Sequence, residues 1–211
     1  MKRVINLDNW NRKEHFKFFS ALDDPFWGIT TTVDFTSVYQ QSKNMEVSFF
    51  LYSVYFLLKC INATTAFKLR IENGEVVEYD KINISPTIGS EDGTFGFGFF
   101  EYDTDLSLFI ENAEKEIHRV KNSAGLSFSK DTARADVIRY SALPWFAFSE
   151  MKHAGSIQTG DSIPKISTGK LIQEKKKLLL PISISVHHGL VDGRNVAEFI
   201  QNLKDGQNNT L

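Results

Sequence analysis

The stretch Ser185-Val186-His187-His188-Gly189-Leu190-Val191-Asp192-Gly193 decides how the rest of the chain is interpreted. It overlaps the end of residues 178–187, where Ile182, Ile184 and Val186 alternate with serines, as the side chains of a β-strand do. Consecutive side chains on a strand point to opposite faces. The two adjacent histidines are therefore expected to differ in their surroundings, with one ring packed inside and the other presented at the end of the strand.

A helix is expected soon after this strand, over residues 196–203. Its apolar stripe has helical spacing and consists of Val196, Phe199, Ile200 and Leu203. Asn195 followed by Glu198 has the spacing of a capping box, and the acidic Asp192 would lie near the positive end of the helix. Residues 205–211 are expected to form a polar C-terminal tail.

The histidine pair allows three interpretations from its local chemistry. A shared metal ion is disfavoured, because the two rings point apart and no cysteine or carboxylate at zinc spacing completes a site. A histidine at a strand end suits a general base, because its ordinary pKa of about 6.5 permits proton transfer near neutrality. A purely structural pair of histidines explains the local pattern equally well.

The remaining segments predict an α+β protein. Strands are expected over residues 27–34 and 137–143, a hairpin over 67–80, and helices over 9–22, 47–63 and 105–121. The hairpin turns at Asn73-Gly74, a pair that type I′ turns favour. The helix over 47–63 is apolar on nearly every side and should be central. We expect one domain over residues 1–204, an α/β two-layer sandwich with a mixed β-sheet and helices packed on one side.

Composition argues against several classes of protein. The net charge is −2 with both signs interspersed, so nucleic acid is not an expected partner. The longest apolar run, Val47 to Leu58, is shorter than the roughly 20 residues that span a membrane, and the N-terminus lacks a signal-peptide pattern. The single cysteine, Cys60, fits a reducing, cytoplasmic location. The 18 phenylalanines predict a core or a contact surface rich in rings.

Four sequence blocks, in one order, resemble the chloramphenicol acetyltransferases. Residues 187–193 (HHGLVDG) resemble the HHxxxDG motif of that family, which the dihydrolipoamide acyltransferase cores share in looser form. Residues 9–16 (NWNRKEHF) resemble its NWxRxxHF block, and residues 141–145 match its SALPW block. Residues 179–186 resemble the strand that leads to the histidines. Because the blocks extend over nearly the whole chain, the resemblance implies the fold of the CoA-dependent acyltransferases.

The resemblance assigns roles to individual residues. His188 would be the general base that takes a proton from an acceptor hydroxyl, which attacks acetyl-CoA directly. Ser141 would donate a hydrogen bond to the oxyanion that this attack creates. Asp192 and Arg12 would form a structural ion pair that holds the turn carrying His188. Ser167 matches a threonine that holds an active-site water in the family.

The resemblance also implies substrates and partners. Pro144 and Trp145 match positions that border the coenzyme A channel, and Lys170 matches a lysine near the phosphates of the coenzyme. Acetyl-CoA is the expected co-substrate, with no metal, and the acceptor is chloramphenicol or another small hydroxyl compound. The family is a homotrimer whose active sites lie at subunit boundaries, and its chemistry is that of antibiotic resistance.

The acceptor pocket is where this sequence departs from the family. His153 replaces an apolar residue that lines the antibiotic pocket, Phe19 stands where tyrosine is usual, and Arg194 stands where phenylalanine is usual. The expected pocket residues are Phe19, Trp27 and His153. An imidazole and a guanidinium would favour a more polar or anionic acceptor, because unpaired buried polar groups are costly. Alternatively, Lys152 and His153 are surface residues of a shifted loop.

Three functions remain open from the sequence. The first is O-acetyl transfer to chloramphenicol or to a more polar acceptor. The second is acyl transfer to a lipoyl thiol, which the lack of a lipoyl domain in this sequence disfavours. The third is a non-catalytic trimeric binding protein on the same scaffold. Retention of both His188 and Ser141 argues against the third, since a binding protein needs neither a base nor an oxyanion donor.

Overall fold

The larger of two β-sheets forms the centre of the molecule in the computed structural model, which describes residues 1–155 and 160–208. Its strand order is β2-β10-β8-β7-β5-β6, with β9 paired to the start of β10. The strands are β2 (Phe26–Asp34), β5 (Asn83–Gly89), β6 (Phe95–Phe97), β7 (Val137–Ala142), β8 (Lys165–Thr168), β9 (Ile172–Glu174) and β10 (Lys177–His187). The β5/β7 and β7/β8 pairs are parallel and the others antiparallel, so the expected mixed sheet is confirmed.

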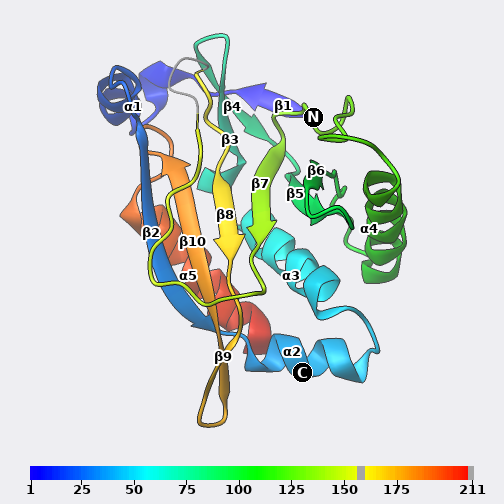
Figure 1. Cartoon of the computed structure of the whole chain (residues 1–211). Helices are drawn as coiled ribbons and strands as arrows, with labels where there is room; N and C mark the ends of the chain where they lie inside the picture. Colours follow the sequence, from blue (N-terminus) through cyan, green and yellow to red (C-terminus); the bar gives the residue numbers. More distant parts are fainter. Residues whose placement is uncertain (156–159, 209–211) are drawn as a thin grey trace.

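Helices cover one face of this sheet (Figure 1). α3 (Phe49–Ala63) and α5 (Gly193–Asn208) pack side by side behind the strands, with α2 (Thr36–Asn44) against α3 and α4 (Leu106–Lys121) beyond the β5–β6 end. The chain between β7 and β8 crosses the opposite face of the sheet. The expected α+β arrangement, with helices on one side, is therefore confirmed. In the part of the chain that the structure describes, no helix is long and apolar enough to cross a bilayer.

The core lies between the sheet and α3, as the apolar character of that helix predicts. Phenylalanine rings make up much of it: the pairs Phe35–Phe56, Phe67–Phe199 and Phe100–Phe109 have centroids 5.9, 4.8 and 6.3 Å apart. Such tilted or edge-to-face pairs are favourable geometries for aromatic rings. Cys60 is buried in α3 as a small core residue.

A second, three-stranded sheet was not predicted, although its hairpin was. β3 (Leu69–Glu72) and β4 (Glu75–Tyr79) form the expected hairpin, and β1 (Lys2–Val4) pairs with the outer edge of β4. The turn residues Asn73 and Gly74 have φ of 51° and 79°, the positive values that a type I′ turn requires.

The N-terminal helix is shorter than predicted, and its buried face was predicted wrongly. α1 comprises Lys13–Ser20 and follows a separate 3₁₀ turn, η1 (Leu7–Asn9). Trp10 is extended and separates the two. The helical spacing of His15, Phe18, Phe19 and Leu22 predicts that these side chains face the core. In the structure the buried side chain is Phe16, while Phe18 and Leu22 are exposed. That prediction requires the helix to pack against the core, whereas α1 lies at the end of the sheet where β10 ends (Figure 1).

The start and the end of the last helix also need correction. The Asp192 carboxylate accepts hydrogen bonds from the N–H groups of Arg194 and Asn195 at 3.0 and 3.2 Å, and the Asn195 side chain accepts from the Asp192 N–H at 3.0 Å. The capping box therefore links Asp192 with Asn195, rather than Asn195 with Glu198. Residues 205–208 belong to α5 and not to a tail. The rest of the expected tail, residues 209–211, lies outside the described residues.

Candidate active site

The two histidines at the end of β10 have different surroundings, as their alternation predicts. His187 is 4% exposed, and its Nδ1 accepts a hydrogen bond from the Gly189 N–H at 3.1 Å. Burial lowers the pKa of His187 to about 4, so this ring is neutral at physiological pH. His188 is only partly buried, and its main-chain N–H donates to the Pro25 carbonyl at 2.8 Å.

Two aromatic side chains hold the ring of His188. Phe19 stacks on the imidazole with ring centroids 3.9 Å apart and an interplanar angle of 15°. Trp27 lies 5.3 Å from it, and the Trp27 indole is itself fixed by donating to the Val191 carbonyl at 3.0 Å. The Nδ1 atom of His188 is buried and has no hydrogen-bond partner among the residues described. These contacts fix the plane of the imidazole, as a proton-transfer group requires.

An ion pair holds the turn that carries His188. The Arg12 guanidinium contacts the Asp192 carboxylate and also donates to the His188 carbonyl at 3.0 Å. Burial alone would raise the pKa of Asp192, but hydrogen bonds from Arg12 and from the main chain of Asn195, together with the Arg12 charge, lower it overall. The expected pair is present, and we call Arg12, Phe19, Trp27, His188 and Asp192 the base half-site.

Ser141 lies in a row of hydroxyl side chains on the face of the large sheet that the helices do not cover. Ser141 is opposite Ser167, Ser167 is opposite Ser183, and Ser183 is opposite Thr30. Opposite residues on neighbouring strands share a face. The Ser141 hydroxyl accepts a hydrogen bond from Thr87 at 3.1 Å, which leaves its own proton free to donate. We call Thr87, Ser141 and Ser167 the hydroxyl half-site.

The two half-sites do not meet within one chain. Ser141 is level with Ser183 across the sheet, and His188 lies five residues further along the chain from Ser183. At about 3.3 Å per residue this offset is roughly 16 Å along the strands, in addition to the two strand spacings between β7 and β10. The side chains of His188 and Ser141 in one chain are therefore too far apart to act on the same acceptor.

Comparison with known proteins places this geometry in a family. A family model for chloramphenicol acetyltransferase matches residues 2–204. The chain belongs to the chloramphenicol acetyltransferase family. Chloramphenicol acetyltransferase 3 of Escherichia coli is 28% identical over 208 residues, which cover 98% of this chain and 97% of that protein. The chloramphenicol acetyltransferase of Staphylococcus aureus is 28% identical over 212 residues, with the same two coverages.

Solved structures agree on the fold. A chloramphenicol acetyltransferase superposes with a TM-score of 0.89 at 30% identity, over 97% of this chain and 99% of that one. A probable dihydrolipoamide acetyltransferase from Listeria monocytogenes has a TM-score of 0.68 at 13% identity, over 98% of this chain and 94% of that one, and shows only the shared fold. As a member of the chloramphenicol acetyltransferase family, the protein is an enzyme of the acetyl-CoA-dependent type.

The residues that the family resemblance assigns to the coenzyme lie together just past Ser141. Pro144 and Trp145 follow β7, and the Trp145 ring is 74% exposed. Lys170 follows β8, and its N–H donates to the Phe146 carbonyl at 2.9 Å, which joins the two segments. An exposed aromatic ring and an exposed lysine on two joined segments fit a ligand with an adenine ring and phosphates.

His153 belongs to the hydroxyl half-site rather than to the surface. Its Nε2 lies 3.0 Å from Ser167 Oγ, and its Nδ1 is buried without a hydrogen-bond partner among the residues described. Burial and the nearby Lys165 charge lower the pKa of His153. The shifted-loop alternative is therefore wrong for His153, although Lys152 is exposed. Arg194 is exposed at the start of α5, so it does not bring the expected guanidinium into the cavity.

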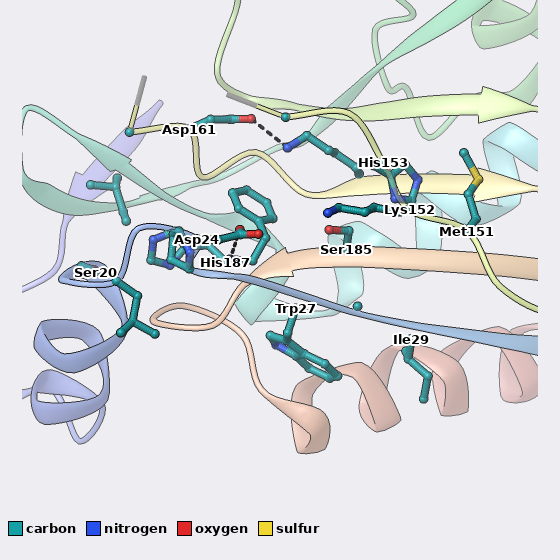
Figure 2. Close-up of a pocket in the computed structure, with 18 of the residues that line it drawn as sticks. Ser20, Asp24, Trp27, Ile29, Met151, Lys152, His153, Asp161, Ser185 and His187 are labelled. Atoms are coloured by element: carbon teal, nitrogen blue, oxygen red, sulfur yellow. Dashed lines mark hydrogen bonds and ion pairs between the residues drawn. The ribbon is translucent and has the colours of Figure 1, made fainter. Parts of the chain in front are cut away.

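A cavity of about 850 Å³ lies between the β2–β10 edge of the sheet and residues 149–155. In Figure 2, His187 lies toward one end of it and His153 toward the other, with Ser185 between them. The expected acceptor residues are divided, since Phe19 and Trp27 contact His188 whereas His153 contacts Ser167. Among residues 1–155 and 160–208, no group of three His, Cys, Asp or Glu side chains is arranged to hold a metal ion.

Several residues around Ser141 were not predicted from the sequence. Phe97 is opposite Thr87 and stacks on Phe128 with centroids 5.4 Å apart, and the Phe128 ring is 69% exposed. Arg139 precedes Ser141 by two residues on β7, so the two side chains share a face. This i, i+2 spacing was visible in the sequence, but the place of Phe97 and Phe128 follows only from the strand pairing.

Proposed function

We propose that the protein transfers the acetyl group of acetyl-CoA to a hydroxyl of chloramphenicol or a related small acceptor, with His188 as general base. The observation that carries this proposal is the environment of His188. Its ring is stacked on Phe19 and its main chain is held by the Arg12–Asp192 pair. A positioned base of this kind contributes about 10²–10⁴ in rate.

The proposed reaction needs two groups of the protein besides the acceptor and the thioester. His188 takes the proton of the acceptor hydroxyl, and the acceptor oxygen attacks the thioester carbonyl carbon. Ser141 donates a hydrogen bond from its hydroxyl to the carbonyl oxygen as that oxygen becomes negative, because Thr87 occupies only the acceptor side of the serine. The carbon–sulfur bond then breaks, and His188 returns its proton to the departing sulfur. Ser167, next to Ser141, is proposed to hold a water molecule.

We infer that the complete site joins the base half-site of one subunit to the hydroxyl half-site of another, in a homotrimer. The separation of roughly 16 Å along the strands between Ser141 and His188 supports this inference. Among structural neighbours of the same fold is the cubic core of a pyruvate dehydrogenase multienzyme complex, with a TM-score of 0.63. Each chain would contribute one acetyltransferase domain over residues 1–204, whose buried core extends from Phe16 to Leu203.

The cellular setting is also part of the proposal. A cytoplasmic location without membrane or nucleic-acid partners fits the single, buried cysteine and the net charge of −2. Chloramphenicol as an acceptor would make the protein an antibiotic-resistance enzyme. The alternative of a different, more polar acceptor is favoured by one observation, the hydrogen bond between His153 and Ser167.

Release of free thiol from acetyl-CoA tests the activity. The purified protein is incubated with acetyl-CoA and chloramphenicol, and the His188→Ala variant is expected to lose about 10²–10⁴ in turnover. His118→Ala, which removes an exposed imidazole from α4, is the matched control and should retain full activity. Equal turnover by His188→Ala and the wild type would overturn the proposal. Formation of S-acetyldihydrolipoamide, followed by chromatography because transfer between thiols leaves the thiol count unchanged, would indicate the lipoyl reaction. Coenzyme binding without transfer to any acceptor would indicate a binding protein.

A further inference from the structure

Arg139 is a partly buried cation beside Ser141. Its Nη1 donates to the Ser85 hydroxyl at 3.2 Å and to the Thr132 carbonyl at 2.7 Å, both of which are uncharged acceptors. No ion pair joins it to an acidic side chain among residues 1–155 and 160–208, and Asp161 acts on it only from longer range. Burial lowers the pKa of Arg139. A desolvated cation without a counter-ion is costly, so an anionic partner would stabilise it.

The strand register places Arg139 in a second row, next to the hydroxyl row. Arg139 is opposite Lys165 on one side and Ser85 on the other, and Lys165 is opposite Ser185. Lys165 already has a counter-ion, since its Nζ lies 3.1 Å from the Asp161 carboxylate. The row therefore holds two cations, Arg139 and Lys165. Only Lys165 forms an ion pair with a carboxylate among the described residues.

Arg139 lies on the acceptor side of Ser141. The coenzyme residues Pro144 and Trp145 follow Ser141 along the chain, whereas Arg139 precedes it by two residues, about 7 Å along the strand. An acceptor whose hydroxyl reaches the thioester beside Ser141 would extend its remaining atoms toward Arg139. His153 lies on the other side of Ser141, because it contacts Ser167, which is opposite Ser141 on β8, and its buried Nδ1 has no hydrogen-bond partner in the described parts of the chain.

We propose that Arg139 selects an acceptor that carries an anionic group, a carboxylate or a phosphate, a few bonds from the hydroxyl that is acetylated. His153, held by Ser167, binds the same acceptor through its free ring nitrogen. The exposed ring of Phe128, which stacks on the partly buried Phe97, offers a place for an apolar or aromatic part of that molecule. This inference rests on the proposed acetyl transfer and names the class of its acceptor.

A matched pair of acceptors tests the inference. N-benzoylserine and N-benzoylserinamide carry the same hydroxyl and the same ring, and differ only in a carboxylate against a neutral amide. Hydrogen bonds to charged groups correspond to about 10- to 100-fold in a rate or binding constant, so the wild type should prefer the carboxylate by that factor in kcat/KM. Glycerol 2-phosphate, compared with glycerol, separates a phosphate site from a carboxylate site.

The variants identify Arg139 as the source of the preference. Arg139→Gln should remove it, while Arg139→Lys, which keeps the charge, should retain part of it. Arg3→Gln, a change to an exposed arginine on β1, is the matched control and should leave the preference unchanged. Thermal unfolding of each variant checks that it has folded. If Arg139→Gln does not fold, the preference measured with Arg139→Lys decides whether Arg139 is its source.

The outcomes that would overturn the inference are distinct from failure of the proposed function. Equal use of each anionic acceptor and its neutral partner by the wild type, or an equal loss on both in Arg139→Gln, overturns it. A rise confined to the KM for acetyl-CoA would assign the anion to the coenzyme and also overturn it. If no acceptor, including chloramphenicol, releases thiol, the proposed function fails. Calorimetric binding of the two benzoyl compounds then decides the inference, and equal affinity contradicts it.

Discussion

Replacing Asp192 by asparagine separates the ion pair of the base half-site from the helix cap. Asparagine caps helices as well as aspartate does, so α5 should keep its N-terminus. What is lost is the charge that faces Arg12, whose side chain is 15% exposed against 35% for Asp192. A hydrogen bond to a charged partner contributes about 1.5–3 kcal/mol, and partial exposure reduces this to about 1–2 kcal/mol of unfolding free energy. For a chain of this size the melting temperature should fall by about 2–8 °C.

Asp192→Asn should also reduce turnover, and this effect should be large although the loss of unfolding free energy is modest. Arg12 also donates to the carbonyl of His188, so a freed guanidinium loosens the turn that carries the base. Misplacement of a catalytic group by about 1 Å costs about 10²-fold, and we expect kcat to fall about 10- to 100-fold with the KM for acetyl-CoA unchanged. Asp105→Asn is the matched control, because Asp105 caps α4 and no ion pair involving it is found among the described residues.

Urea unfolding at one protein concentration, together with thiol release, measures both effects. The pH dependence adds a third readout, because the pKa of Asp192 is lowered in the folded protein. Its stabilisation is present above the ordinary aspartate pKa of about 4 and is lost as the pH falls through the lower folded value. Asp192→Asn should lack this component. Wild-type urea midpoints and wild-type kcat in this variant would refute the reasoning.

Three further outcomes follow from single contacts. Ser141→Ala should lower kcat by about 10²-fold with unchanged thermal unfolding, and a change of less than about threefold would contradict the oxyanion role. Burial raises the pKa of Cys60 to about 12, so iodoacetamide near pH 8 should label it only after unfolding; rapid labelling of the native protein would show that the site opens. Gly28→Ala should destabilise the protein by about 1–3 kcal/mol, because a Cβ there would lie 2.9 Å from the Ile184 carbonyl oxygen, and an unchanged melting temperature would contradict this.

Elements with a strong pattern of their own were predictable from the sequence. The hairpin at Asn73-Gly74 and the apolar helix α3 needed only turn chemistry and hydrophobicity. The missed elements lack such a pattern. β8 has four residues, too few for alternation to be distinctive, and α2 buries only Val38 and Ser42. Their structure depends on the neighbours against which they pack.

The candidate site was predictable where a motif carried it. The Arg12–Asp192 pair came from the family resemblance, and local chemistry alone left the histidine pair open between a catalytic and a structural role. Arg139 was missed because its significance depends on the strand register and on the absence of an ion pair to an acid among the described residues. Neither is visible in a linear sequence.

The most direct test of the central claim mixes two inactive variants. Ser141→Ala and His188→Ala subunits are unfolded together, refolded in equal amounts, and assayed for thiol release. If each site takes its base from one chain and its oxyanion donor from the next, about a quarter of the sites in random trimers are intact, and about a quarter of the wild-type activity should return. No recovery in correctly refolded mixed trimers would contradict the account.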